Sequence, residues 1–167
     1  VNRFWFIKPD GTRHFYDKRH LFRMGNEHNA YCSGSDRIIV EYLGFRILLQ
    51  ICYDLRFPVF SRNQNDYDVA IYVANWPAVR DHHWRQLLMA RAIENQAYVI
   101  GCNRIGEDIR GTEHCGSSLI VDASGEILDE LPANQQGIVK SELNKHQLDE
   151  LRNKFPVHMD ADKFQLL

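Results

Sequence analysis

One nearly unbroken apolar run decides the fold of this chain: Gly44-Phe45-Arg46-Ile47-Leu48-Leu49-Gln50-Ile51-Cys52-Tyr53-Asp54-Leu55-Arg56-Phe57-Pro58. A run of this kind predicts a buried strand, and it places Cys52 at the carboxyl end of that strand. A thiol at the mouth of a buried strand can attack a carbonyl or nitrile carbon. Free cysteines are also often buried as small apolar side chains, so position alone leaves both interpretations open.

The size and charge of the chain fit one globular domain that binds small molecules or other protein chains. Its 167 residues suffice to bury a real core. With 20 Lys and Arg against 22 Asp and Glu, the formal net charge of -2 indicates neither a nucleic-acid nor an acidic-membrane partner. No apolar stretch reaches the roughly 18 to 20 residues of a membrane helix, and no signal peptide opens the chain. We therefore expect a cytoplasmic protein.

The spacing of cysteines and histidines predicts no metal site and no disulfide framework, and no cofactor is expected. The four cysteines, Cys32, Cys52, Cys102 and Cys115, include no C-x-x-C pair, and the eight histidines show no H-x-x-x-H spacing. Cys102 ends the apolar run that starts at Val99, so we expect it to be a core thiol.

The remaining pattern predicts an α/β fold with a mixed sheet. Residues 3–7 and 13–16 flank an Asp-Gly turn and predict a hairpin that delivers Lys18 just past a strand end. Residues 23–36 have the composition of a loop, and residues 37–42 resume as a strand.

The second half of the chain predicts a βαβ unit followed by a hairpin and a helix. Strands are expected at 67–74 and 97–102, with a helix between them that Asp81 caps. An apolar stripe along this helix, Trp84, Leu87, Leu88 and Ala92, is expected to pack on the sheet. Residues 117–122 and 126–131 predict a further hairpin. Asn144 can cap a last helix as part of a capping box with Gln147.

Acyl transfer through a thiolate needs an activated nucleophile, a group that moves protons and a cation or donor pair for the oxyanion. Cys52, Lys18 and a carboxylate would supply all three. A lysine in the charged sequence Asp17-Lys18-Arg19 is, on its own, more often simply solvated.

Four motifs follow one another along the chain: the run from Lys18 to Phe22, the strand ending Ile51 to Pro58, the turn Asn75-Trp76-Pro77 and the helix Arg91-Ala92-Ile93-Glu94-Asn95. In order and spacing they resemble the carbon–nitrogen hydrolase, or nitrilase, superfamily. The chain looks most like the ω-amidase branch, which hydrolyses the distal amide of dicarboxylic acid monoamides such as 2-oxoglutaramate. The resemblance implies part of a four-layer α-β-β-α sandwich with mixed sheets.

The resemblance also implies roles for individual residues. Cys52 is the nucleophile that forms a thioester, Lys18 stabilises the tetrahedral oxyanion, and the backbone N–H of Tyr53 is a natural second donor. Glu27 is implied as a supporting glutamate that orients Lys18 or the substrate amide, against the alternative of a solvated loop acid. Glu94 has a competing claim, but we interpret it as structural.

Three further residues are expected to contact substrate. Asn75 and Trp76 end a strand beside the nucleophile strand and would wall the pocket, although Trp76 could equally be a core residue. Arg56 is more often a structural ion-pair partner, yet an acid-bearing substrate needs a cation. The histidines His82, His83 and His114 are interpreted as surface or hydrogen-bonding residues.

The chain departs from the family pattern at its beginning. The general-base glutamate of the family lies well before the lysine motif, and no such segment precedes Val1. Residues 1–167 are therefore expected to be a carbon–nitrogen hydrolase domain that lacks its N-terminal portion. Since general acid–base catalysis is typically worth about 10²–10⁴-fold, we expect the isolated chain to be nearly inactive.

The leading hypothesis is an enzyme that hydrolyses the amide of a small carboxylate-bearing substrate and releases ammonia. Within the enzyme class, the alternatives are an N-carbamoyl amide hydrolase and a nitrilase. Outside it, the absent base leaves open a non-catalytic fragment or pseudoenzyme. A thiol redox switch is disfavoured because no vicinal resolving cysteine is visible. Family members are commonly dimers or larger, which implies a homo-oligomer.

Overall fold

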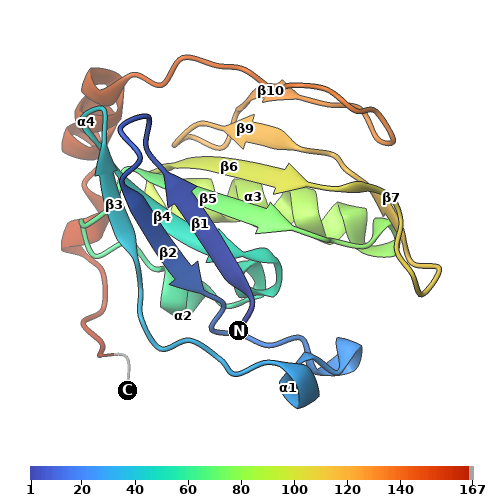
Figure 1. Cartoon of the computed structure of the whole chain (residues 1–167). Helices are drawn as coiled ribbons and strands as arrows, with labels where there is room; N and C mark the ends of the chain where they lie inside the picture. The colour runs from blue at the N-terminus through green and yellow to red at the C-terminus, as the bar shows by residue number, and fades with distance from the viewer. Residues whose placement is uncertain (166–167) are drawn as a thin grey trace.

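A six-stranded mixed sheet is the centre of the molecule, as expected for the α/β class (Figure 1). The computed structural model describes residues 1–165. Its strand order is β10-β9-β6-β5-β4-β3, and the central strands β4, β5 and β6 are parallel. The sheet strands are β3 (Ile39–Tyr42), β4 (Phe45–Ile51), β5 (Val69–Ala74), β6 (Tyr98–Asn103), β9 (Leu119–Val121) and β10 (Ile127–Glu130).

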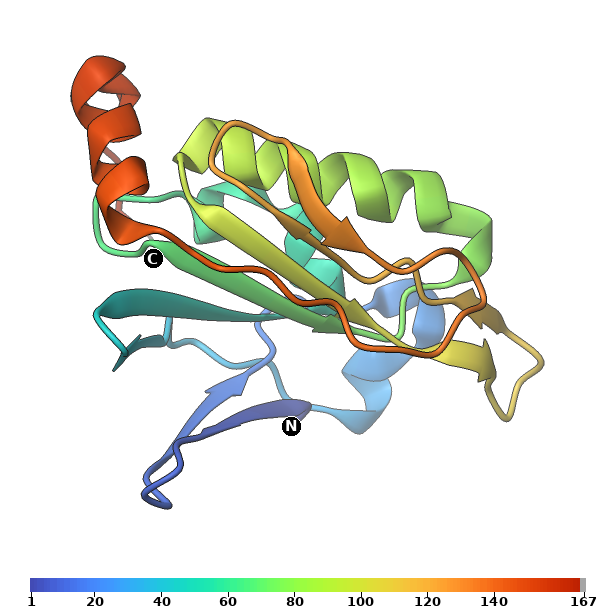
Figure 2. The ribbon, with the colours of Figure 1, turned by 90° about the horizontal axis from the view of Figure 1, so that it is seen from above.

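One face of the sheet is covered by the long helix α3 (Asp81–Asn95) (Figure 2). Trp84, Leu88 and Ala92 are fully buried in that interface, as the predicted stripe requires. Gly101 of β6 allows the close approach, because a Cβ there would lie 2.4 Å from a methyl carbon of Leu88. Asp81 was predicted to be the N-cap, but it lies inside the first turn and makes no capping bond.

The opposite face is partly covered by the N-terminal hairpin of β1 (Arg3–Ile7) and β2 (Arg13–Asp17) (Figure 2). These antiparallel strands confirm the hairpin predicted around the Asp-Gly turn. Tyr16 is fully buried in an apolar cluster with Leu49 of β4. The hairpin thus fixes the chain just before Lys18 against the sheet.

Several short elements were not predicted. The segment 23–36, expected to be loop, contains the 3-10 turn η1 (Arg23–Gly25) and the one-turn helix α1 (Glu27–Ala30). Strands β7 (Ile105–Glu107) and β8 (Glu113–Cys115) form a second small hairpin. Elements of three or four residues are too short to show a hydrophobic period. The remaining short elements are η2 (Cys52–Arg56), α2 (Pro58–Ser61), η3 (Ala78–Arg80) and η4 (Val157–Met159).

Helix α4 (Lys145–Lys154) begins at the predicted cap. The Asn144 side chain accepts a hydrogen bond from the Gln147 backbone N–H at 3.0 Å. The reciprocal half of the capping box is replaced by a tertiary contact, because the Asn144 N–H donates to the Tyr98 hydroxyl of β6 at 3.2 Å. The cap therefore also ties α4 to the sheet.

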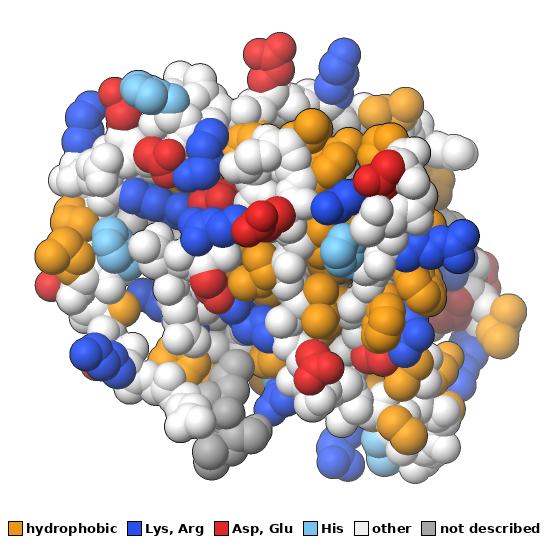
Figure 3. Space-filling model, turned by 60° about the vertical axis from the view of Figure 1, so that its left-hand side comes forward, with side chains coloured by type: hydrophobic (Ala, Val, Ile, Leu, Met, Phe, Trp, Pro, Cys, Tyr) orange, Lys and Arg blue, Asp and Glu red, His pale blue; other side chains and the backbone are white. Residues whose placement is uncertain are grey.

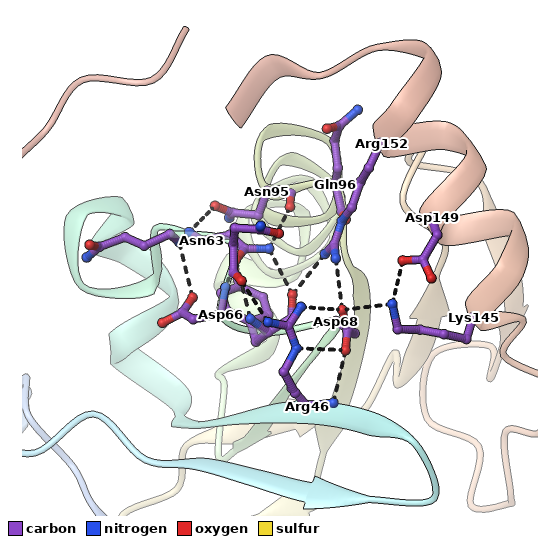
Figure 4. Close-up of polar contacts among 12 residues, drawn as sticks. Arg46, Asn63, Asp66, Asp68, Asn95, Gln96, Lys145, Asp149 and Arg152 are labelled. Atoms are coloured by element: carbon purple, nitrogen blue, oxygen red, sulfur yellow. Dashed lines mark hydrogen bonds and ion pairs between the residues drawn. The ribbon is translucent and has the colours of Figure 1, made fainter. Parts of the chain in front are cut away.

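A buried carboxylate, Asp68, joins α4 to the start of β5 (Figure 4). It accepts hydrogen bonds from Arg152 of α4 at 2.8 Å and from Arg46 of β4 at 2.9 Å, and Lys145 lies 3.6 Å away. Burial alone would raise the pKa of Asp68, but the hydrogen bonds from Arg46 and Arg152 outweigh it and lower the pKa to about 2. Asp68 thus holds three cations around one fully buried side chain.

Replacing Asp68 by asparagine is expected to lower the free energy of unfolding by about 3–5 kcal/mol at pH 7, because it leaves the buried Arg152 without its counter-charge. A lowered pKa gives stability that is present above the unfolded-state value near 3.8 and lost as pH falls through about 2. The difference between wild type and variant should therefore shrink by about 2 kcal/mol between pH 5 and pH 2 in urea titrations.

The exposed ion pair of Asp149 with Lys145 supplies the matched control for this experiment. Replacing Asp149 by asparagine is expected to change stability by less than about 1 kcal/mol, because surface pairs contribute little. Equal losses in the two variants would contradict a special role for Asp68.

The surface is mixed in charge where Figure 3 shows it, with Lys and Arg side chains lying beside Asp and Glu side chains. On this face the two signs are interspersed, in keeping with the nearly balanced composition. None of the helices within residues 1–165 has the length and apolar character of a membrane-spanning segment.

Candidate active site

Cys52 stands at the point where β4 ends and η2 begins. Its φ of 47° lies in the left-handed region, which residues with a side chain rarely adopt. Such a conformation costs on the order of 1–3 kcal/mol and persists only where the surrounding structure enforces it. The Sγ atom lies 3.9 Å from the backbone oxygen of Asn75, at the end of β5. The strand end thus turns sharply and presents the thiol beside the neighbouring strand.

The fully buried carboxylate of Asp54 holds this turn in place. It accepts the backbone N–H of Ile51 at 3.0 Å and the hydroxyl of Tyr16 at 2.8 Å. It also accepts the backbone N–H of His20 at 2.9 Å and lies 2.8 Å from the His20 ring Nδ1. Because Tyr16 and His20 flank Lys18, one carboxylate fixes the lysine segment and the nucleophile turn together.

Lys18 is 1% exposed and is held by Glu27 of α1. The Lys18 Nζ donates to both carboxylate oxygens of Glu27, at 2.9 Å and 2.7 Å. Glu27 also accepts the backbone N–H of Phe22 at 2.8 Å. A buried cation requires such a partner, and the paired bonds fix the direction of the ammonium group.

A cavity of about 460 Å³ lies at the carboxyl ends of β4, β5 and β6, the edge toward which their arrowheads point in Figure 1. Its size is within the range of small-molecule sites. The structure brings every residue of the predicted site to this one cavity. The lining includes Lys18, Glu27, Cys52, Tyr53, Arg56, Asn75 and Trp76.

The surroundings of Cys52 favour the neutral thiol over the thiolate. Burial raises the pKa of Cys52, while the positive charge of Lys18 acts in the opposite direction. Nucleophilic attack therefore needs a base that takes the proton. Among the described residues, Glu27 is the carboxylate that lines the cavity, and it already binds Lys18 and Phe22.

Trp76 is both core residue and pocket wall, so the two interpretations of its sequence position hold together. It is 3% exposed and packs against Trp84 of α3 at a ring distance of 5.5 Å. Its backbone N–H donates to the side-chain oxygen of Asn103 at 2.7 Å, and its indole N–H donates to the backbone oxygen of Arg80 at 2.8 Å. The wall is therefore fixed before any ligand arrives.

Sequence reasoning missed Asp54, Asn103 and Arg80. Asn103 ends β6 as Asn75 follows β5, so the rule that polar side chains at the ends of parallel strands converge could have found it. Asp54 belongs to the quoted nucleophile motif, but its partners come from another segment and leave no local signal. Glu94, interpreted as structural, pairs with Arg91 at 2.9 Å.

The prediction that Cys102 is a core thiol is wrong. Cys102 is exposed and lines the cavity. It pairs in register with Val73 of β5, whereas its neighbour Gly101 faces α3. Alternation along the strand thus turns Cys102 to the face that α3 does not cover.

The possible metal ligands of the described residues, His, Cys, Asp and Glu, do not gather into a metal-binding group. No group of three or more His, Cys, Asp or Glu among residues 1–165 is arranged to hold a metal ion. His114, one of the three histidines interpreted as surface or hydrogen-bonding residues, is buried, with its Nδ1 3.3 Å from the Gly106 oxygen.

Comparison with known proteins gives a consistent result. The carbon-nitrogen hydrolase family model matches residues 1–153. Omega-amidase YafV of Escherichia coli strain K12 is 57% identical over 166 residues, which are 99% of this chain and 65% of that protein. The 2-oxoglutaramate amidase of Bacillus subtilis strain 168 is 39% identical over 150 residues, 89% of this chain and 57% of that protein.

A solved structure agrees with these sequence relatives. The crystal structure of a CN-hydrolase superfamily protein from Xanthomonas campestris, with an arsenic adduct in its active site, superposes with a TM-score of 0.96 at 43% identity. The match covers 99% of this chain and 65% of that one. The chain thus spans 65% or less of the length of these three relatives. On the family match and the shared fold, the chain belongs to the carbon–nitrogen hydrolase family.

Proposed function

We propose that the protein containing this chain hydrolyses the amide bond of a small carboxylate-bearing substrate such as 2-oxoglutaramate and releases ammonia. The observation that carries the proposal is the meeting of Cys52, Lys18 and Glu27 at one cavity. The relatives named omega-amidase and 2-oxoglutaramate amidase, at 57% and 39% identity, support the substrate class.

In the first half-reaction, the Cys52 sulfur attacks the amide carbon. A C–S bond forms, and the carbonyl electron pair moves to oxygen, where the Lys18 ammonium and the Tyr53 backbone N–H stabilise the negative charge. The C–N bond then breaks, and the amide nitrogen leaves as ammonia with the proton that the thiol lost. In the second half-reaction, water attacks the thioester, and the products are the carboxylic acid and the free thiol.

We assign Glu27 the role of a positioning residue. Its two oxygens already bind the Lys18 ammonium and the Phe22 N–H, so it orients the cation toward the oxyanion. We assign the proton transfers to and from Cys52 to another glutamate, the general base that the family resemblance places before the lysine motif, because Glu27 already accepts three hydrogen bonds from Lys18 and Phe22.

Three further residues that line the cavity would bind the rest of the substrate. Asn75 and Trp76 form the side of the cavity, and Arg56 supplies a cation for the carboxylate. The Arg56 guanidinium lies over the Trp76 ring, 5.0 Å from its centroid, which orients its planar donors.

Ammonia release by the purified full-length enzyme tests the proposal. Matched five-carbon substrates would carry an amide, an N-carbamoyl group or a nitrile. We expect kcat/KM for the amide to exceed the other two by about 100-fold or more, because the site must match the geometry of one reacting group. Faster turnover of the carbamoyl compound or the nitrile would contradict the proposed substrate class. If none of the three substrates is turned over, the proposal that the protein is an amide hydrolase is contradicted.

We further propose that the protein acts in the cytoplasm as a homo-oligomer, a dimer or larger. All four cysteines are free thiols, which suits a reducing compartment.

The surface offers apolar side chains for the proposed assembly. Val59, Val79 and Ile93 are each more than half exposed and lie on α2, η3 and α3. Apolar side chains of this kind are available to a second copy, and light scattering of the full-length protein measures the assembly size.

A further inference from the structure

Arginines gather at the cavity beyond what the reaction chemistry needs. Arg56, Arg80 and Arg104 line it together with Lys18. Lys18 is neutralised by Glu27, but no carboxylate pairs with the three arginines within residues 1–165. An excess of positive charge in a cavity favours an anionic ligand.

Arg80 is the most distinctive of these arginines. Its side chain makes no hydrogen bond or ion pair with another described residue. Its guanidinium lies over the face of Phe22, 5.6 Å from the ring centroid, and Phe22 belongs to the lysine motif. A cation–π contact of this kind holds the guanidinium in place without using its N–H donors.

The backbone of Arg80 is fixed at the same time. Its carbonyl oxygen accepts the Trp76 indole N–H at 2.8 Å, and its N–H donates to the Pro77 oxygen at 3.0 Å. A side chain with free donors on a fixed backbone is preorganised for a ligand, so little conformational entropy is lost on binding.

Arg56 is held in a parallel way. Its guanidinium lies over the Trp76 ring, and its Nη2 lies 2.8 Å from the ring Nδ1 of His83, which is not an acidic partner. The two guanidinium groups therefore rest on two different aromatic rings, Trp76 and Phe22, that line the same cavity.

We propose that Arg80 acts with Arg56 to bind the distal carboxylate of the substrate, and that Arg80 is the residue that selects ω-amides of 2-oxo acids over neutral amides. This inference rests on the proposed amidase function. Two guanidinium groups can bind the carboxylate and the adjacent 2-oxo oxygen at once, which a single arginine cannot do with the same geometry.

The test compares two substrates of equal length in the full-length enzyme, 2-oxoglutaramate and pentanamide. Replacing Arg80 by glutamine is expected to lower kcat/KM for 2-oxoglutaramate by about 10- to 100-fold, the usual effect of losing a charged hydrogen bond. The same variant should change kcat/KM for pentanamide by less than about 3-fold. Arg80→Lys keeps the charge but not the planar fork. Its kcat/KM for 2-oxoglutaramate should lie between those of the wild type and Arg80→Gln.

Arg85→Gln is the matched control, because Arg85 lies on α3 outside the cavity and pairs with Glu130. It should leave the preference between the two substrates unchanged. A loss of equal size for both substrates in Arg80→Gln, or no loss for either, overturns the inference.

A binding measurement separates this inference from the proposed function. Calorimetry with 2-oxoglutarate, the acid that hydrolysis would release, uses the full-length Cys52→Ala protein with and without Arg80→Gln. We expect the dissociation constant to rise by about 10-fold or more in the double variant. If the wild type releases no ammonia from any amide, the proposed function fails, whereas an unchanged dissociation constant defeats only the inference about Arg80.

Discussion

Replacing Cys52 by alanine in the full-length enzyme is expected to reduce ammonia release from 2-oxoglutaramate by about 10⁴-fold or more. The loss should be this large because the thiol is the atom that forms the covalent intermediate, so no weaker version of the same pathway is left. The side chain is small and only partly exposed, and its one hydrogen-bond contact with the described residues is the 3.9 Å approach to the Asn75 oxygen. The fold should therefore survive the change.

Intact-protein mass spectrometry after rapid quenching provides the second measurement. The wild type should show a transient thioester adduct during turnover, and the Cys52→Ala variant should show none. Cys32→Ala serves as the control, because Cys32 is an exposed free thiol that does not line the cavity. Ammonia release that persists in the Cys52 variant, at a rate near that of the Cys32 variant, would rule out the proposed mechanism.

The parts of the site that could be predicted from sequence are those that local patterns determine. A continuous apolar run placed Cys52 at a strand end, and an Asp-Gly turn placed Lys18 just after a hairpin. Both positions are confirmed by β4 and by the pairing of β1 with β2. Hydrophobic periodicity alone could not predict that these two residues share a site. That expectation came from the order of the motifs and their resemblance to the family.

The parts that could not be predicted depend on which segments meet in space. Asp54 binds Tyr16 and His20, more than 30 residues earlier in the chain, and nothing local indicates that pairing. Cys102 looked like a core residue because its apolar neighbours are buried. Its exposure follows from the register of β6 on β5 and from which face α3 covers. A short sequence window contains neither fact.

The ion pair of Lys18 and Glu27 lies between these two cases. Sequence identified Glu27 as the acid in the right loop, but it left open whether the carboxylate contacts the lysine, the substrate or water. The structure places both Glu27 oxygens on the Lys18 Nζ. The proposed positioning role of Glu27, which acts through Lys18, can be tested by kinetics.

Replacing Lys18 by methionine is expected to lower kcat by about 10²–10³-fold, the usual loss when one preorganised oxyanion donor is removed. KM should change much less, because the charge on the oxygen develops only in the transition state. Methionine has a similar length and suits the buried position. Lys154→Met, at the exposed end of α4, is the control for losing a lysine and should leave kcat unchanged.

Comparing Glu27→Gln with the Lys18→Met/Glu27→Gln double variant decides how Glu27 acts. If Glu27 works by orienting the Lys18 ammonium, the double variant should be no slower than Lys18→Met alone, because the group that Glu27 positions is already gone. If Glu27 transferred protons independently, the two losses would multiply, and the double variant would be slower by the full factor of Glu27→Gln. The bidentate contact at 2.7 Å and 2.9 Å, together with the Phe22 N–H on the same carboxylate, favours the first outcome.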